Sequence, residues 1–181
     1  MFTTDPVAEA RDCWIAQGWA QAAPALAMVA SLDRVRQIYV SRLEAQLRPL
    51  NLSLARFELL MQLYFSKDQQ LSLGRLRMRL QVAPGAVTNA VNRLERDGLV
   101  TRVTDPTDAR ITIATMTPTG RKRALEAAEI VNQVVFSDTK MSLPEMAELF
   151  DALAVIRHRA GDFPADVTGG GRAWAGSNRR L

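Results

Sequence analysis

Residues 71–120 read LSLGRLRMRLQVAPGAVTNAVNRLERDGLVTRVTDPTDARITIATMTPTG, and this stretch decides the fold. Ser72 begins a short helix whose inward face carries Leu73, Leu76 and Leu80. Pro84 stands at the start of a second helix that is expected to reach Asp97. Gly98 follows as its stop, because glycine tolerates the left-handed backbone that is common there. The pattern predicts two short helices joined by a turn, which is the arrangement of a helix-turn-helix.

A hairpin is predicted directly after the second helix. Alternating residues form strands over Val100–Thr104 and Ile111–Met116, and a turn that contains Asp, Pro and Thr separates them. Arg110 lies just past the tip of this turn, two residues after Asp108. An exposed arginine there holds no core together, so it reaches for water, for a carboxylate or for a negatively charged molecule. We expect Asp108 to hold its guanidinium by a charge-assisted hydrogen bond.

The second helix has two chemically different faces. At about 100° per residue, one face is apolar and carries Val87, Val91 and Leu94. The opposite face carries Thr88, Asn89, Asn92, Arg93 and Arg96. Hydroxyl, amide and guanidinium groups are the groups that bind base edges and phosphates in a major groove. The apolar face is therefore expected to pack on the domain, and the polar face is expected to meet DNA.

Basic residues concentrate in one window of the chain. The whole chain has a net charge of +4, whereas residues 74–123 hold ten basic and four acidic residues, a local charge of +6. A basic block in an otherwise mildly acidic chain indicates a site for a polyanion, with nucleic acid as the first candidate. Together with the helix pair and the hairpin, it predicts a winged helix-turn-helix that binds DNA. Arg110 would then meet the minor groove beside the recognition helix, because the negative potential of that groove attracts arginine.

Helices are predicted on both sides of this segment. Three of them are expected over Asp5 to about Gly18, Pro24 to about Leu47, and Thr117 to about Thr139. A further helix is capped by Ser53, and a last one begins with the capping-box spacing Ser142 to Glu145. The long second helix carries Leu32, Val35, Tyr39 and Leu43, and the buried stripe after Ser53 is expected at Phe57, Leu60, Met61 and Tyr64. Residues from Pro164 onward, which include Trp174, Arg179 and Arg180, are expected to form a flexible tail.

The predicted fold class is mainly α with a small β wing. We expect a dimerisation trunk from 1–50 and 121–163, a winged helix-turn-helix domain over 51–120, and the tail over 164–181. With one cysteine (Cys13) and one histidine (His158), an intrachain disulfide, a transition-metal cluster and a His-based catalytic triad are not expected. No catalytic residue and no cofactor are predicted. No leader and no apolar run of about 20 residues is found, so the expected location is the cytoplasm.

The segment 71–120 resembles the multiple-antibiotic-resistance regulator (MarR) family. The likeness rests on VTNAVNRLERDGLV in the helix pair, on Asp108-Ala109-Arg110 in the hairpin, and on Thr117-x-x-Gly120 after it, and it extends weakly over about residues 30–160. The resemblance implies a homodimer with a shared helical trunk and two winged lobes on a palindromic site. It also implies a repressor that releases DNA when a small, often aromatic, effector binds between trunk and lobe.

Carried over by position, the resemblance implies roles for individual residues. Arg110 is the minor-groove residue and Asp108 orients it, and the recognition helix contributes Thr88, Asn89, Asn92 and Arg93. Ser72 is expected to contact phosphate. Arg75, Arg77 and Arg79 are expected either to contact phosphates or to be solvated charges, with equal weight. The chain departs from the family at Ala83-Pro84-Gly85-Ala86, where small hydroxyl residues are usual. Base reading should therefore depend more on Asn89, Asn92 and Arg93.

The sequence does not decide which molecule or condition the regulator responds to. Trp14, Trp19, Tyr39, Phe57, Met61 and Tyr64 are candidates for an aromatic effector pocket, although core or dimer interface is the expectation for most of them. Cys13 is an alternative, as an oxidation sensor beside Arg11, but the residues Cys13-Trp14-Ile15 favour a packed, buried thiol. A further alternative is a ligand-sequestering or protein-interaction module with weak DNA affinity, which the hydroxyl-poor segment at 83–86 motivates.

Overall fold

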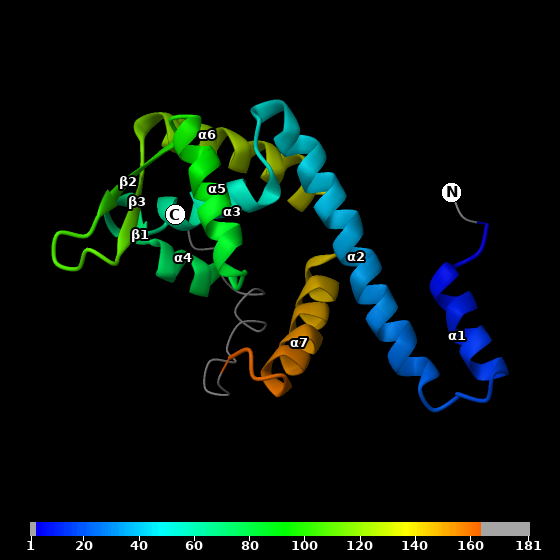
Figure 1. The fold of residues 1–181 in the computed structure, drawn as a ribbon. Helices are drawn as coiled ribbons and strands as arrows, with labels where there is room; N and C mark the ends of the chain where they lie inside the picture. Colours follow the sequence, from blue (N-terminus) through cyan, green and yellow to red (C-terminus); the bar gives the residue numbers. More distant parts are fainter. Residues whose placement is uncertain (1–2, 164–181) are drawn as a thin grey trace. The chain divides into compact units, whose positions relative to one another are not determined.

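A computed structural model describes residues 3–163, which divide after Ser137 into two compact units (Figure 1). The fold is mainly helical with one small antiparallel sheet. The first unit contains α1 (Pro6–Ala16), α2 (Ala23–Leu47), α3 (Leu54–Tyr64), β1 (Gln70–Ser72), α4 (Leu73–Leu80), α5 (Pro84–Arg96), β2 (Val100–Thr104), β3 (Thr112–Met116) and α6 (Pro118–Val131). The second unit contains α7 (Leu143–Arg159).

The sheet has the strand order β1-β3-β2. The hairpin of β2 and β3 was predicted to within one residue, since β3 begins at Thr112 and not at Ile111. The strand β1 was missed. It is three residues long and pairs antiparallel with β3, Leu71 opposite Ala114. This pairing fixes the start of α4 against the hairpin, so that the helix-turn-helix and the wing form one lobe.

The core of the first unit is built around α3. Leu59, Leu60 and Leu63 are fully buried there, and Phe57 is nearly so. The predicted stripe was therefore partly wrong, because Met61 and Tyr64 are only half-buried and pack at the edge of the core. The apolar face of α5 was predicted correctly, and Val87, Val91 and Leu94 are buried with Ala90 between them.

The N-terminal helices form a hairpin in which α1 packs on α2 (Figure 1). Asp5 caps α1 by accepting from the backbone N–H of Val7, and Gly18 begins the connection to α2 at a φ of +87°, which favours glycine. The rings of Trp14 and Trp19 meet edge to face, 4.9 Å apart. The expectation of a buried thiol was wrong, since Cys13 is exposed on α1. No residue of α1 is buried, so the packing of α1 on α2 leaves the thiol in water.

The predicted ends of the long helix and of α3 are confirmed, whereas the predicted end of α6 was wrong. Ser53 caps α3 as expected, and the long helix ends at Leu47, after which Arg48–Leu50 form a single 3-10 turn that includes Pro49. By contrast, α6 was predicted to reach Thr139 but ends at Val131, where a π turn over Asn132–Phe136 follows. Arg42 of α2 donates to the backbone oxygen of Val134 at 3.2 Å, a carbonyl within that turn.

The second unit begins with the predicted capping box. The backbone N–H of Ser142 donates to Glu145 Oε2 at 2.7 Å, and the hydroxyl of Ser142 also lies 2.7 Å from that oxygen. These bonds lower the pKa of the Glu145 carboxyl. The predicted tail from Pro164, with Trp174, Arg179 and Arg180, lies outside the described residues. Over 3–163, none of the helices combines the length and the apolar character that crossing a bilayer requires.

Candidate nucleic-acid interface

The second helix of the pair, α5, presents an exposed polar face. Thr88, Asn89, Arg93 and Arg96 are exposed, on the side opposite buried Val87 and Val91. No side chain caps the first turn, because Ala83 occupies the cap position, and a Cβ added at Gly85 would meet nothing within 4 Å. The start of α5 is therefore open to the close approach of another backbone, as the hydroxyl-poor sequence suggested.

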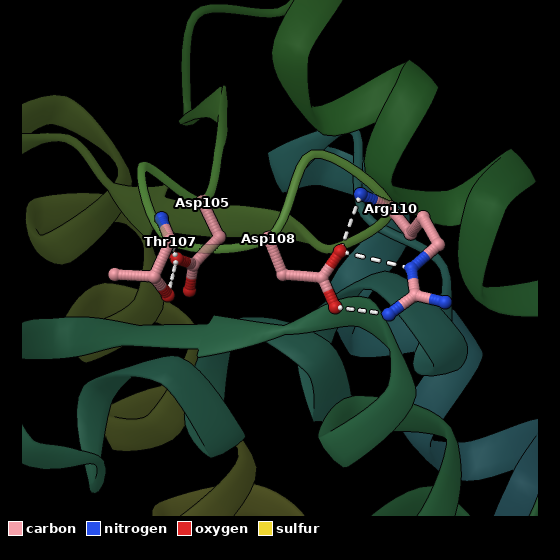
Figure 2. Close-up of polar contacts among 4 residues, drawn as sticks. All are labelled: Asp105, Thr107, Asp108 and Arg110. Carbon is pink, nitrogen blue, oxygen red and sulfur yellow. Dashed lines mark hydrogen bonds and ion pairs between the residues drawn. The ribbon is translucent and has the colours of Figure 1, made fainter.

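The wing carries a guanidinium held by a neighbouring carboxylate (Figure 2). Arg110 donates from Nε to Asp108 Oδ1 and from Nη2 to Asp108 Oδ2, both at 3.0 Å, and its backbone N–H donates to Oδ1 at 3.0 Å. The Arg110 side chain is 90% exposed. The remaining N–H groups of the guanidinium face away from Asp108, so the side chain is oriented and still able to donate.

The turn itself is cross-linked by short polar contacts. The backbone N–H and the hydroxyl of Thr107 donate to Asp105 Oδ1 at 2.8 and 2.6 Å (Figure 2). These bonds lower the pKa of Asp105, and the bonds from the Arg110 side chain and backbone lower the pKa of Asp108. Both carboxylates are consequently ionised at neutral pH, and the pairing in turn raises the pKa of Arg110.

An arginine without a predicted role connects α5 to β2. Arg102 donates from Nη1 to Asn92 Oδ1 at 2.6 Å, and its Nη2 pairs with the Glu95 carboxylate. Asn92, predicted on the DNA-facing side, is therefore half-buried and engaged within the lobe by its amide oxygen. One signal could have pointed to this contact: Arg102 is two residues after buried Val100 on the same strand, so both side chains leave the same face of the sheet.

The first helix of the pair, α4, brings the other candidate residues together. Ser72 caps α4 by accepting from the backbone N–H of Arg75 at 3.3 Å. Arg75, Arg77 and Arg79 are all exposed on this helix. An open hollow of about 470 Å³ lies beside it, and among its lining residues are Ser72, Arg75, Arg79, Asp105, Ile111 and Ile113. Arg77 does not line this hollow.

Contacts of Thr117 and Gly120 hold the end of α5 and the hairpin in place. The Thr117 hydroxyl donates to the Gly98 oxygen at 2.8 Å and accepts from the Gly120 N–H at 2.9 Å. Gly120 packs so closely that a Cβ there would lie 2.0 Å from the Leu99 oxygen. This geometry gives the physical reason for the Thr117-x-x-Gly120 spacing.

At the C-terminal end of α5, Arg56 of α3 pairs with Asp97, the residue that follows the helix. Arg56 is 7% exposed and donates from Nη1 to the Asn51 oxygen at 2.8 Å, whereas its buried Nε has no partner within the described residues. Sequence reasoning missed this pair because no spacing links residues 56 and 97.

The candidate effector residues do not form one group. Phe57 belongs to the core, and Tyr39, Met61 and Tyr64 pack against it. Trp14 and Trp19 lie on the α1–α2 hairpin, exposed by 37% and 53%. None of the six lines the hollow beside α4. Within residues 3–163, no group of three or more His, Cys, Asp or Glu side chains is arranged to hold a metal ion.

Comparisons with known proteins agree with this geometry. The MarR family model matches residues 52–112. The uncharacterized HTH-type transcriptional regulator YdgJ of Bacillus subtilis (strain 168) is 30% identical over 116 residues, which cover 63% of this chain and 69% of YdgJ. The crystal structure of Sco5413, a MarR family transcriptional regulator from Streptomyces coelicolor, is 36% identical with a TM-score of 0.71, covering 77% of this chain and 97% of Sco5413.

A more distant likeness concerns the fold alone. Sco3205, a MarR family transcriptional regulator from Streptomyces coelicolor that was solved in complex with DNA, is 22% identical with a TM-score of 0.65 and covers 78% of this chain and 89% of its own. The matches to YdgJ and Sco5413 are closer and span most of those chains. Together with the winged helix-turn-helix lobe and the exposed polar face of α5, they show that this chain belongs to the MarR family of DNA-binding transcriptional regulators.

Proposed function

We propose that the chain is a homodimeric repressor that binds a palindromic operator through α5 and the wing. The observation that carries this proposal is the Asp108–Arg110 pair, which presents an oriented, 90% exposed guanidinium beside a helix with an exposed polar face. An arginine at the tip of a hairpin can enter a minor groove while the adjacent helix lies in the major groove. A local charge of +6 over residues 74–123 supplies attraction to phosphates.

Exposed apolar side chains support the homodimer. The hairpin of α1 and α2 exposes Trp14, Ile15, Trp19, Met28, Val29, Leu32, Val35 and Ile38. On α7, Leu143, Leu149, Val155 and Ile156 are exposed as well. A monomer rarely leaves so many large apolar residues in water along continuous helices, and a second copy of the chain would cover them. Two lobes related by a two-fold axis would then contact half-sites about one helical turn apart.

Release by a small effector is the regulatory part of the proposal. It follows from membership of the family, and it requires an effector that binds the DNA-incompetent dimer more tightly than the DNA-bound form. Tyr39, Met61 and Tyr64 are half-buried at the edge of the core and remain candidates for that contact.

Binding to the DNA upstream of the chain's own coding region tests the proposal. Fluorescence anisotropy over a salt series compares wild type with Arg110→Ala, with random DNA as competitor and with Arg159→Ala, an exposed arginine outside the lobe, as a control for lost charge. We expect tight, specific and salt-sensitive binding that Arg110→Ala loses and Arg159→Ala retains. Weak binding that is equal on random DNA and insensitive to Arg110→Ala would instead favour an interaction module with weak DNA affinity. Light scattering that finds only monomer at micromolar concentration would contradict the dimer.

A further inference from the structure

The arginine that joins the recognition helix to the wing has a consequence for base recognition. Arg102 reaches from β2 to two residues of α5, Asn92 and Glu95, which are one turn apart on the helix. The side chain of Arg102 is 33% exposed and that of Glu95 is 36% exposed, so the ion pair is partly shielded from water. The guanidinium is therefore anchored at Glu95, and it meets Asn92 from one fixed side.

This contact decides which way the Asn92 amide points. A guanidinium has donors only, so the Asn92 atom that lies 2.6 Å from Arg102 must be the carbonyl oxygen. The hydrogen-bond network thus settles the orientation of the amide. The Nδ2 group is the atom left over, and within the described residues it has no hydrogen-bond partner.

The free amino group lies on the polar side of α5. Asn92 follows Asn89 by three residues and Thr88 by four, so the three side chains neighbour one another on the helix surface. An asparagine with both amide atoms free recognises adenine, because Oδ1 accepts from N6 and Nδ2 donates to N7. With one of its two lone pairs occupied by Arg102, Oδ1 could accept from the N6 amino group of adenine only by sharing the oxygen with a guanidinium, whose own N–H donors lie beside it.

We propose that Arg102 makes Asn92 act mainly as a donor, so that its preferred counterpart on DNA is an acceptor, guanine N7 and O6 or a phosphate oxygen, over adenine. The proposal rests on the proposed function, since it concerns how the same helix reads its operator. Guanine offers two acceptors to one amino group, whereas adenine offers one acceptor next to a donor. Arg102 is in this view a positioning residue that sets specificity without touching DNA.

Selection from a randomised double-stranded DNA library with the full-length protein tests this inference. Wild type, Asn92→Ala, Arg102→Met and Arg121→Met are compared by sequencing the enriched DNA. Methionine keeps an unbranched apolar stem but frees the Asn92 oxygen, and Glu95 is exposed enough to be solvated in its place. Arg121→Met removes an equal charge from an exposed residue at the start of α6. Circular dichroism and thermal unfolding check that each variant is folded.

If Asn92 reads a base, one position of the site loses its preference in Asn92→Ala. There we expect wild type to favour guanine over adenine by about fivefold or more, Arg102→Met to accept adenine nearly as well, and Arg121→Met to keep the wild-type preference. If the acceptor is a phosphate, Asn92→Ala instead weakens all sequences alike and lowers the salt dependence. In both cases Asn92→Asp, which replaces the amino donor by an acceptor, loses more affinity than Asn92→Ala.

Two results would overturn the inference. One is a wild-type preference for adenine at the position that Asn92→Ala relaxes. The other is an Asn92→Ala variant with unchanged affinity and unchanged sequence preference. A wild-type protein that enriches no sequence at all would be a different failure, because it would reject the proposed function itself and the inference with it.

Discussion

The guanidinium of Arg110 and the carboxylate of Asp108 are joined by two parallel hydrogen bonds of 3.0 Å while the arginine stays 90% exposed. The pair orients a charge that is otherwise free to move, which lowers the entropy that the side chain loses on binding. Arg110→Ala is expected to weaken binding to all DNA sequences by about 1–3 kcal/mol. Asp108→Asn should cost less, since it keeps the arginine and one acceptor. Anisotropy titrations of both variants measure this order, and an Asp108→Asn loss equal to that of Arg110→Ala would contradict it.

The same pair predicts how the wing responds to acid. The pKa of Asp108 is lowered by the side-chain and backbone hydrogen bonds of Arg110, so it lies below the value of the unfolded chain. The ionised carboxylate therefore favours the ordered wing at every pH above about 4, and this contribution is lost as the pH falls through the lowered pKa.

Carbon-13 NMR of the aspartate carboxyls measures this titration directly. Thr107→Val is the matched control, because the hydrogen bonds of Thr107 are the main cause of the lowered pKa of Asp105. In that variant the pKa of Asp105 should rise and that of Asp108 should stay low. An Asp108 that titrates at or above the ordinary carboxyl value would show that the pair does not persist in solution.

Two glycines provide a test of the packing beneath the wing. A Cβ at Gly120 would lie 2.0 Å from the Leu99 oxygen, whereas a Cβ at Gly74 would meet nothing within 4 Å. Gly120→Ala must displace backbone and should lower the free energy of unfolding by about 2 kcal/mol or more. Gly74→Ala, in the exposed first turn of α4, should be neutral or raise it by up to about 1 kcal/mol. Urea unfolding of the two variants compares them, and equal stabilities would refute the close contact.

Local patterns were sufficient to predict the helix pair and the hairpin. The Ser53, Thr117 and Ser142 caps, the positive φ of Gly98 and the strand Val100–Thr104 were all predicted from the sequence and are present in the structure. Each of these features is determined by residues within a few positions of one another, where capping and turn chemistry are specific.

What the sequence did not predict depends on residues far apart in the chain. The strand β1 is only three residues long, and it forms because β3 provides a partner 43 residues after Leu71, at Ala114. The contacts of Arg102 with Asn92 and of Arg56 with Asp97 likewise join different elements. The helix wheel placed Asn92 on the polar face of α5 but contained no information about its neighbour on β2, which engages the amide oxygen.

The ion pair of buried Arg56 with Asp97 predicts an asymmetry between its two members. Asp97 follows the C-terminal end of α5, where a negative charge is unfavourable against the helix dipole, and Arg56 compensates it. The Arg56 side chain is 9% exposed and that of Asp97 is 32% exposed. Asp97→Ala leaves a buried guanidinium without its counter-charge, and we expect the free energy of unfolding to fall by about 2 kcal/mol, less than for a fully buried pair. Arg56→Met should cost less, because the remaining carboxylate can turn to water while methionine fills the space.

Urea unfolding of Asp97→Ala, Arg56→Met and the double variant separates the two contributions. The double variant should be no less stable than Asp97→Ala, since methionine removes the uncompensated charge that the single change leaves behind. DNA affinity should follow the same order, because Asp97 ends the helix that carries Asn89 and Arg93. A double variant with a loss equal to the sum of the two single losses would mean that the residues act independently, and the pair would then have no part in holding the recognition helix.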